Sequence, residues 1–332
     1  MKAFIVDKYG KDSRPRAGDI PVPKIGDHDV LVRVLAAGVN PLDLKLIAGE
    51  FKKVMPYKTP FVIGNDVAGV IEEIGSKVDR FAVGDEVYAR PAADRIGSFA
   101  EYLAMSQDDV AAKPEQVSMA EAASLPLVAL TAWQALVERA DVQPGQRVLI
   151  HAGSGGVGTV AIQLAKHLGA FVATTSSAAN AAWLRELGAD LVVDYRTEDF
   201  TEVLHDYDVV LDSLGADSIL RSLQVLRPGG MAISLGGPPD PDLARQLGKP
   251  MLRPVLAILS RKVRAAARKR GVTYSFLLMR ADGGQLQRIT ELVETGALKP
   301  VVDRTFAFED ALDALDYVGT GRAKGKVVLT ME

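Results

Sequence analysis

Three glycines follow a short apolar run near the middle of the chain, at a spacing suited to binding phosphate. The run Val148–Ile150 leads into a turn in which Gly153, Gly155 and Gly158 form the pattern G-x-G-x-x-G. The first glycine permits a tight bend, the second lets a pyrophosphate approach the backbone, and the third lets a helix pack closely on a strand. The turn is also expected to need a positive φ at Gly155. Apolar residues at helical spacing follow over 157–168, so free N–H groups at that helix N-terminus would face the anion.

The elements predicted around this turn are those of a parallel sheet. Apolar, strand-like runs recur about every twenty residues, the rhythm of strands alternating with helices. They lie at 148–150, 171–173, 191–193, 209–211, 231–235 and 273–278. We therefore predict an α/β fold with a doubly wound parallel sheet. A glycine turn that binds no ligand is the alternative for the pattern taken alone.

The flanking segments predict a second domain. Short β-like runs separated by Gly, Pro and Asp fill the first part of the chain, as in a small irregular β-barrel. They lie at 62–63, 67–74, 86–89 and 99–104. A capping box at Ser118–Glu121 precedes a mostly apolar helix at 127–137. Strand-like residues 305–308 and 326–330 surround a helix at 309–318 and are expected to return to the first domain. The predicted limits are 1–122 for the barrel, 123–279 for the parallel sheet and 280–332 for the return.

Composition narrows the class of protein. A chain of 332 residues with 48% apolar and 24% charged residues is long enough for two domains with a sizeable core. A net charge of −3 gives no general attraction to nucleic acid, and no apolar run reaches the length of a bilayer span. The first residues form a strand pattern rather than a signal peptide, so a cytoplasmic location is expected. The chain has no cysteine, which excludes disulfides, thiol nucleophiles and thiolate-bound metals.

One strongly basic stretch lies between Arg253 and Arg270. Between these two arginines it contains no acidic residue and five further basic ones, Arg261, Lys262, Arg264, Arg268 and Lys269. Such a run could contact membrane phospholipid or an anionic substrate. The simpler interpretation is a solvated helical lid inserted before the last strand of the sheet.

Six ordered motifs resemble the zinc-free quinone oxidoreductase branch of the medium-chain dehydrogenase/reductase superfamily, over essentially the whole chain. Besides the glycine turn they are Gly38-Val39-Asn40-Pro41-Leu42-Asp43, Gly64-Asn65-Asp66-Val67-Ala68-Gly69-Val70-Ile71, Val83-Gly84-Asp85-Glu86-Val87-Tyr88, Leu130-Thr131-Ala132-Trp133 and Gly325-Lys326-Val327-Val328. The resemblance implies a GroES-like barrel on the substrate side, a Rossmann domain carrying NADPH, a cleft between them and a homodimer.

The departures from zinc-dependent relatives concern the metal. Those relatives use cysteine and a Gly-His-Glu motif, whereas this chain has no cysteine and has Gly64-Asn65-Asp66 in that place. The cysteine-rich lobe is replaced by a short loop at 91–97. We therefore expect no metal. Without a Lewis acid, quinones and α,β-unsaturated carbonyls suit hydride transfer better than simple alcohols or ketones.

The end of the second strand favours NADPH over NADH. Residues 174–177 are Thr-Thr-Ser-Ser, and no acid follows until Glu186, whereas NAD-specific folds place a carboxylate there. The resemblance assigns Ser177, Asn180 and Tyr195 to the 2′-phosphate, with Asn180 in place of a lysine. Arg322 or Lys324 could compensate for that charge. Ser177 and Asn180 could equally cap the next helix.

The resemblance also assigns residues to the reacting end of the cofactor. It implies that Asn40 and Asp43 lie beside the nicotinamide, Thr131 at its carboxamide, and Lys45 at the ribose or on a proton path. Asn40 as a turn residue and Lys45 as a solvated lysine are the alternatives. Phe51 aligns with a tyrosine proton donor of enoyl-thioester reductases and lacks its hydroxyl, which counts against that subfamily.

The remaining predicted contacts complete the cofactor and substrate sites. An apolar acceptor pocket is expected to use three aromatic residues, each of which could instead belong to the core: Tyr57, Phe61 and Phe276. The other predicted cofactor contacts are Gly153, Ser154, Gly155, Gly156, Val157, Gly158, Ser176, Leu235, Gly236, Phe276, Leu277, Leu278, Lys324, Gly325 and Lys326.

The sequence thus predicts an NADPH-dependent reductase of quinones or α,β-unsaturated carbonyls that works without metal. A reductase of enoyl thioesters or of another enone is the alternative within the enzyme class. An NADPH-binding or RNA-binding protein with little turnover is the alternative from another class. No nucleic acid is expected as a partner, because the chain has no aromatic and basic platform beyond the run from Arg253 to Arg270.

Overall fold

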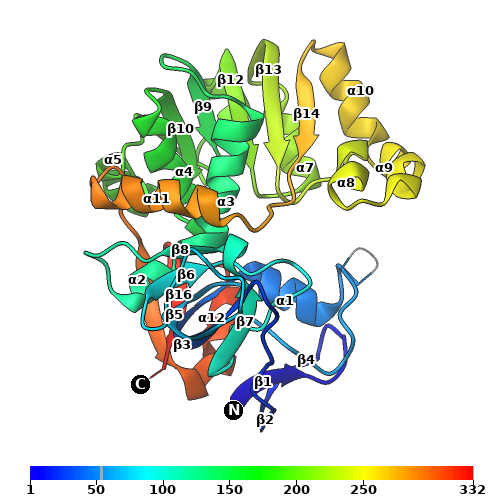
Figure 1. The fold of residues 1–332 in the computed structure, drawn as a ribbon. Coiled ribbons are helices and arrows are strands. Elements are labelled where there is room, and N and C mark those ends of the chain that lie inside the picture. The colour runs from blue at the N-terminus through cyan, green and yellow to red at the C-terminus, as the bar shows by residue number, and fades with distance from the viewer. Residues whose placement is uncertain (53–54, 332) are drawn as a thin grey trace. The chain divides into compact units, whose positions relative to one another are not determined.

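The computed structural model describes residues 1–52 and 55–331, and the chain divides into two compact units (Figure 1). Unit 1 combines Met1–Leu130 with Arg280–Glu332, and unit 2 is Thr131–Met279. The division after Leu130 falls inside helix α3 (Pro126–Trp133), whereas the limit expected from sequence is 122/123. The predicted helix at 127–137 is two pieces, because α3 continues into a π-helical stretch at Gln134–Arg139.

Unit 2 is built on a six-stranded parallel sheet, which confirms the predicted α/β class. Its strand order is β11-β10-β9-β12-β13-β14, so the order reverses at the β9–β12 pair, where doubly wound sheets bind ligands. Val148, Leu149 and Ile150 of β9 are all buried, as expected for a strand covered on both faces. The strands are β9 (Arg147–Ile150), β10 (Phe171–Ser176), β11 (Leu191–Asp194), β12 (Tyr207–Asp212), β13 (Leu226–Ser234) and β14 (Thr273–Phe276).

Helices connect these strands. The first four are α4 (Gly156–His167), α5 (Ala181–Glu186), α6 (Phe200–Val203) and α7 (Ala216–Ser222). Three more lie between β13 and β14, namely α8 (Pro241–Gln246), α9 (Arg253–Leu259) and α10 (Arg261–Lys269). The basic stretch is therefore helical, as predicted.

Unit 1 contains a seven-stranded sheet around the long strand β3 (Asp29–Val39). The path runs β15-β16-β3-β5-β6-β8, and β7 also pairs with β3. Register shifts between β3 and β5 at Val34/Ala36 are the bulges expected where a small barrel bends. The other strands of this sheet are β5 (Val67–Ile74), β6 (Glu86–Ala89), β7 (Tyr102–Ser106), β8 (Val110–Ala112), β15 (Val302–Ala307) and β16 (Lys326–Thr330).

A three-stranded sheet and four helices complete unit 1. The sheet has the order β2-β1-β4, with β1 at Lys2–Val6, β2 at Arg16–Asp19 and β4 at Phe61–Val62. The helices are α1 (Pro41–Ala48), α2 (Met119–Ala123), α11 (Gly283–Glu294) and α12 (Ala311–Gly319). Helix α2 begins with the predicted capping box, in which Ser118 and Glu121 bond reciprocally. The strand expected at 99–104 begins only at Tyr102, since Ala100 makes an isolated bridge to Ala3.

Candidate functional site

The glycine turn of unit 2 joins β9 to α4. Gly155 is the N-cap of α4 with φ −82° and ψ 170°, which is extended backbone open to any residue. The left-handed position of the turn is Ala152, with φ 54°. The positive φ expected at Gly155 is therefore wrong, because the sharp bend comes three residues earlier.

The three glycines have different reasons for being glycine. A Cβ at Gly153 would lie 2.1 Å from Thr174 Oγ1, and a Cβ at Gly158 would lie 2.4 Å from the Ala152 carbonyl oxygen. At these two positions the surrounding backbone and side chains leave no room for a Cβ atom. A Cβ at Gly155 would meet only the Ala152 carbonyl oxygen, at 3.4 Å. The backbone at Gly155 is therefore open to an approaching group, as the dinucleotide pattern requires.

A buried histidine supports this turn. The imidazole of His151 lies 3.0 Å from Thr175 Oγ1 through Nδ1 and 3.0 Å from Ser222 Oγ through Nε2. Thr175 Oγ1 also accepts the Ala152 N–H at 3.2 Å, and Ser222 donates to Asp212 Oδ2 at 3.1 Å. Burial lowers the pKa of His151, partly opposed by Asp212, so the ring is neutral. Sequence reasoning missed this role, although a histidine directly after a buried strand is a visible signal.

Polar side chains converge where β10 ends. The Asn180 side-chain amide donates to Ser176 Oγ at 3.1 Å and to Ser177 Oγ at 3.3 Å. Ser176 in turn donates to Ser154 Oγ of the glycine turn at 3.3 Å. Asn180 Oδ1 is buried and has no hydrogen-bond partner among the described residues. Neither Ser177 nor Asn180 makes a side-chain cap bond, so helix capping does not explain them.

A tyrosine and a cation stand beside this cluster. The Tyr195 N–H donates to the Ser176 carbonyl at 3.3 Å, and the Tyr195 side chain is 60% exposed. The guanidinium of Arg196, which the sequence analysis did not single out, lies 5.8 Å from the Tyr195 ring centroid. Asp194 is paired in register with Ser176 and accepts the Arg196 N–H at 3.1 Å. This edge of the sheet therefore combines hydroxyls, one cation and one carboxylate.

The other residues predicted in unit 2 lie at the ends of β13 and β14 or on α3. Leu235 and Gly236 follow β13, at the same carboxyl edge of the parallel sheet as the glycine turn. Phe276 is 7% exposed and packs in an apolar cluster with Leu243 and Leu256, with Leu278 partly buried against it, while Leu277 is 6% exposed. Thr131 is 5% exposed. The core alternative thus describes the observed surroundings of Phe276.

Unit 1 contains a buried polar cluster at the start of α1. Asp43 accepts the Asn40 N–H at 2.7 Å through one carboxylate oxygen and the Asn65 side-chain amide at 2.7 Å through the other. Asp43 is fully buried, and burial raises its pKa to about 7, against the opposing effect of the Asn65 and Asn40 hydrogen bonds and of Lys326. A carboxyl of this kind holds a proton over part of the neutral pH range.

Lys326 connects this cluster to the last strand. Its ammonium donates to Asn40 Oδ1 at 2.5 Å and to Asp66 Oδ2 at 2.9 Å, and it is 5% exposed. Asp66 also accepts the Asn40 side-chain amide at 2.9 Å and the Leu127 N–H at 2.6 Å. The ammonium predicted to contact cofactor is therefore engaged inside the barrel. Asp66 was not predicted as a site residue, although it stands in the quoted Gly64-Asn65-Asp66 motif.

Arg90 extends the cluster. Its guanidinium donates to the Pro91 carbonyl at 2.8 Å and to Asn65 Oδ1 at 3.5 Å, while its Nε has no partner among the described residues. Burial lowers the pKa of Arg90. The sequence offered no signal for this residue, because an arginine at the end of a strand is usually solvated.

The structure separates Lys45 from Asn40 and Asp43. Lys45 is exposed and lines a hollow of about 500 Å³ together with Lys11, Arg14 and Asp316. This matches the solvated alternative. Lys324 is also exposed, and Gly325 has φ 85° with no room for a Cβ beside the Val301 carbonyl oxygen.

Tyr57 and Phe61 come together in unit 1. Their rings stack with centroids 5.1 Å apart, and Phe61 also lies 5.6 Å from the Tyr9 ring. The Tyr57 hydroxyl donates to the Ala93 carbonyl at 2.5 Å. Burial raises the pKa of Tyr57 to about 12. The hydroxyl is thus both occupied and protonated. Both rings are partly buried against the apolar core of unit 1, so the core alternative describes their surroundings.

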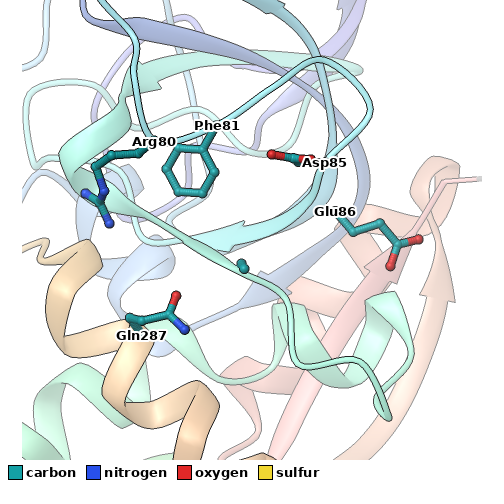
Figure 2. Close-up of a pocket in the computed structure, with 6 residues that line it drawn as sticks. Arg80, Phe81, Asp85, Glu86 and Gln287 are labelled. Carbon is teal, nitrogen blue, oxygen red and sulfur yellow. The ribbon is translucent and has the colours of Figure 1, made fainter.

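A separate hollow of about 480 Å³ contains none of the predicted site residues (Figure 2). Arg80, Phe81, Asp85, Glu86 and Gln287 line it, all in unit 1. The Arg80 guanidinium lies 5.4 Å from the Phe81 ring centroid and 3.9 Å from Asp108. These are ordinary surface contacts.

The described residues contain neither a metal-binding cluster nor a membrane-spanning helix. Within 1–52 and 55–331, no group of three or more His, Cys, Asp or Glu side chains is placed to hold a metal ion. No helix in the described part of the chain is long and apolar enough to cross a membrane.

The chain is similar to known proteins over nearly its whole length. Residues 26–115 match the family model described as alcohol dehydrogenase GroES-like domain, and residues 187–329 match the one described as zinc-binding dehydrogenase. The 2-methylene-furan-3-one reductase of Solanum lycopersicum is 36% identical over 99% of this chain and 79% of its own length. The chloroplastic NADPH-dependent alkenal/one oxidoreductase of Arabidopsis thaliana is 35% identical with the same coverage.

A solved structure extends the likeness to the whole fold. The quinone oxidoreductase from Coxiella burnetii superposes with a TM-score of 0.87 at 32% identity, covering 100% of this chain and 99% of that one. Fold and relatives together define the chain as an oxidoreductase with a GroES-like and a Rossmann-type part. It belongs to the medium-chain dehydrogenase/reductase family, in the quinone oxidoreductase-like branch.

Proposed function

We propose that this chain transfers hydride from NADPH to a quinone or an α,β-unsaturated carbonyl without using a metal. The observation that carries the proposal is the open backbone at Gly155, where a Cβ would meet nothing closer than 3.4 Å. A glycine that packing does not require is explained by a group that must approach it. The pyrophosphate of a dinucleotide fits that position, at the N-terminus of the 12-residue helix α4.

The preference for NADPH is supported at the end of β10. Ser176, Ser177 and Asn180 hold their polar atoms together, and the buried Asn180 Oδ1 lacks a partner. Arg196 supplies the positive charge that Asn180 lacks and is the cation we assign to the 2′-phosphate. Asp194 opposes this preference. The Arabidopsis relative is named as an NADPH-dependent oxidoreductase, which supports the same assignment.

The chain's own residues orient the reactants and manage protons. NADPH, when bound, supplies the hydride. Asn40 is fixed by Lys326 and Asp66, so its side chain is a preorganised polar group rather than a mobile turn residue. Asp43 holds a proton near neutral pH and keeps Asn40 in place through its backbone N–H. Thr131 at the carboxamide and Lys45 on a proton path stay predictions, and the exposure of Lys45 favours the solvated alternative.

Two relatives and one solved structure support the proposed acceptor class. The tomato and Arabidopsis enzymes are named for enone and alkenal reduction, and the Coxiella structure is named a quinone oxidoreductase. An enoyl-thioester reductase is less well supported, because Phe51 packs against the apolar core of unit 1 and has no hydroxyl. We also propose a homodimer on the family resemblance, which light scattering would test. The cytoplasmic location stays a prediction.

The proposal is tested by measuring the rate at which the purified protein oxidises NADPH in the presence of each of a panel of acceptors. We expect turnover with 1,4-benzoquinone or with 2-alkenals, and none with saturated ketones or, in reverse, with alcohols and NADP⁺. Turnover confined to alcohols and ketones would contradict the proposal. Because the saturated aldehyde and the allylic alcohol have the same mass, proton NMR of the product distinguishes reduction of the C=C bond from reduction of the carbonyl.

Chelation tests the metal-free part of the proposal. The sequence has no thiolate, and Asn65 stands where zinc-dependent relatives place histidine, so dialysis against EDTA is expected to leave the rate unchanged. Rates are compared before and after dialysis with the same acceptor. Loss of turnover that zinc restores would show that the assignment is wrong.

A further inference from the structure

Helices α9 and α10 of unit 2 carry a charge unlike that of the rest of the chain. Residues 249–270 contain eight of the 39 Lys and Arg residues and none of the 42 acids, in a chain whose net charge is −3. Lys249, Arg253, Arg261, Lys262, Arg268, Lys269 and Arg270 are exposed, and Arg264 is half-buried. Within the described part of the chain, the seven Lys and Arg residues of 253–270 form no ion pair with a carboxylate. The positive charge of these seven residues is therefore not compensated by a neighbouring carboxylate.

Large apolar side chains are exposed directly beside these cations. Met251 is 82% exposed, Val255 53%, Ile258 73% and Leu259 55%, which makes four of the nine large apolar side chains exposed in the described residues. They follow one another at helical spacing, so they form a stripe along α9 and the turn before it. Isolated exposed apolar residues are ordinary, but a contiguous stripe marks an interaction site.

The stripe does not result from loose packing of the two helices. Helix α9 is anchored through Leu256, which packs with Leu243 and Phe276. Helix α10 is anchored through Val263 and Ala267, which belong to the core beneath the parallel sheet. Each helix thus already buries one face, and the stripe is a second apolar surface.

We infer that α9 and α10 form a docking surface for an anionic lipid bilayer; we call residues 249–270 the basic–apolar surface. Aliphatic side chains insert at the boundary between headgroups and acyl chains, and flanking Lys and Arg bind lipid phosphates. The complementarity lies in charge, because uncompensated cations border the stripe. This inference does not depend on which acceptor the enzyme reduces.

Two other occupants fit the surface less well. A second copy related by a twofold axis would set the basic–apolar surface against itself, cation against cation. Single-stranded nucleic acid is bound by aromatic side chains on which bases stack, and residues 249–270 contain no aromatic residue. A bilayer uses both the aliphatic stripe and the cations.

Vesicle co-sedimentation of the full chain tests the inference. We expect binding to phosphatidylcholine vesicles containing about 30% phosphatidylglycerol, and at least tenfold weaker binding to phosphatidylcholine alone. Binding should fall steeply in about 0.5 M NaCl, because salt screens exposed charges. Absence of binding to the anionic vesicles, or equal binding to both kinds, would overturn the inference.

A charge variant assigns the binding to these helices. It replaces three exposed cations of the surface, Arg261→Gln, Lys262→Gln and Lys269→Gln. The control variant removes the same charge from exposed cations elsewhere, Lys8→Gln, Lys24→Gln and Arg288→Gln. We expect the surface variant to bind anionic vesicles roughly tenfold more weakly or worse, and the control to bind like wild type. Equal loss in both variants would mean that only net charge matters, which overturns the assignment.

An apolar variant tests the stripe separately. Val255→Ser with Ile258→Ser is compared with a control pair of exposed valines in unit 1, Val22→Ser with Val83→Ser. We expect weaker vesicle binding, by roughly tenfold, only for the stripe variant, with thermal unfolding and reductase rates unchanged in both. A stripe variant that binds vesicles normally, or that changes from dimer to monomer by light scattering, would overturn the inference. Salt-sensitive binding to RNA without binding to vesicles would also overturn it.

Discussion

At the scale of single residues, Gly155 separates a binding role from a packing role. A Cβ there meets only one atom, at 3.4 Å, and φ is −82°, so Gly155→Val is compatible with the fold without cofactor. We expect NADPH affinity to fall by at least two orders of magnitude, roughly 2.7 kcal/mol at 1.36 kcal/mol per tenfold. Fluorescence titration measures the affinity, and thermal unfolding without cofactor should change little.

Gly158→Val provides the matched control, because its Cβ would lie 2.4 Å from the Ala152 carbonyl oxygen. This variant is expected to lose stability before any question of binding arises. If Gly155→Val were destabilised to the same degree, Gly155 would serve packing. Normal NADPH binding by Gly155→Val would place the dinucleotide elsewhere.

The buried carboxyl of Asp43 predicts a particular pH dependence. Its pKa is about 7 in the folded chain and 3.8 as a reference value, so the folded state holds a proton that the unfolded state has lost between these values. Its contribution to stability is complete below about pH 4 and declines as pH rises through about 7. We expect Asp43→Asn to remove this pH-dependent contribution. The difference in free energy of unfolding between low and high pH should therefore change by about 1 kcal/mol or more.

Urea unfolding of wild type and Asp43→Asn at pH 5 and pH 8 measures that term. The comparison cancels other groups, including His151, whose lowered pKa acts in the opposite sense. For His151 stability is lost as pH falls below its unfolded value. Parallel pH profiles of the two proteins would show that Asp43 is ionised throughout.

At the scale of elements, the ends of β10 and β11 control the choice of dinucleotide. Tyr195→Ala removes the exposed ring beside Arg196, and Arg196→Gln removes the cation itself. We expect each substitution to lower the affinity for NADPH by roughly tenfold and to leave the affinity for NADH nearly unchanged, since only NADPH has a 2′-phosphate. Wild type should bind NADPH at least tenfold more tightly than NADH. Equal losses for both cofactors would argue for a purely structural role.

The elements that sequence predicted well are those buried on both sides. The strands of the parallel sheet are continuous apolar runs, so β9, β10 and β12 are visible without any partner. Barrel strands have one exposed face and bulges, and the strand expected at 99–104 consequently lies at Tyr102–Ser106. Residue spacing alone located the glycine turn. It did not show that Ala152 rather than Gly155 has positive φ.

The parts of the candidate site that sequence could not predict depend on long-range pairing. Lys326 reaches Asp66 across 260 residues only because β16 pairs with β3. The opposite orientation of Asp43 and Lys45 depends on the face that α1 buries: two residues apart on a helix, they point in nearly opposite directions. The Lys326–Asp66 contact and the opposite orientations of Asp43 and Lys45 both depend on tertiary packing, which a local sequence pattern does not predict.

At the scale of the whole molecule, the buried pair Lys326–Asp66 ties the last strand into unit 1. Lys326→Met would leave Asp66 buried without its cation, and we expect a loss of about 3–5 kcal/mol in the free energy of unfolding. The double variant with Asp66→Asn should recover part of this loss. Urea unfolding measures the free energy of unfolding of the single and the double variant. Hydrogen exchange locates the effect, and we expect reduced protection of backbone amides in unit 1 only. Additive losses in the double variant would show that the two side chains do not interact.

The pairing of β3 with β16 also orders events during synthesis. Residues Ala36–Val39 of β3 bond to Val327–Thr330, while unit 2 is continuous in sequence and is complete once Met279 has emerged. Val39 leaves the ribosome 287 residues ahead of Lys326, an interval on the order of 15–60 s at cellular translation rates. Throughout that interval the nascent chain presents an unpaired, apolar strand end. Until β16 has emerged, this edge is therefore open to pairing with other chains, however stable the finished enzyme is.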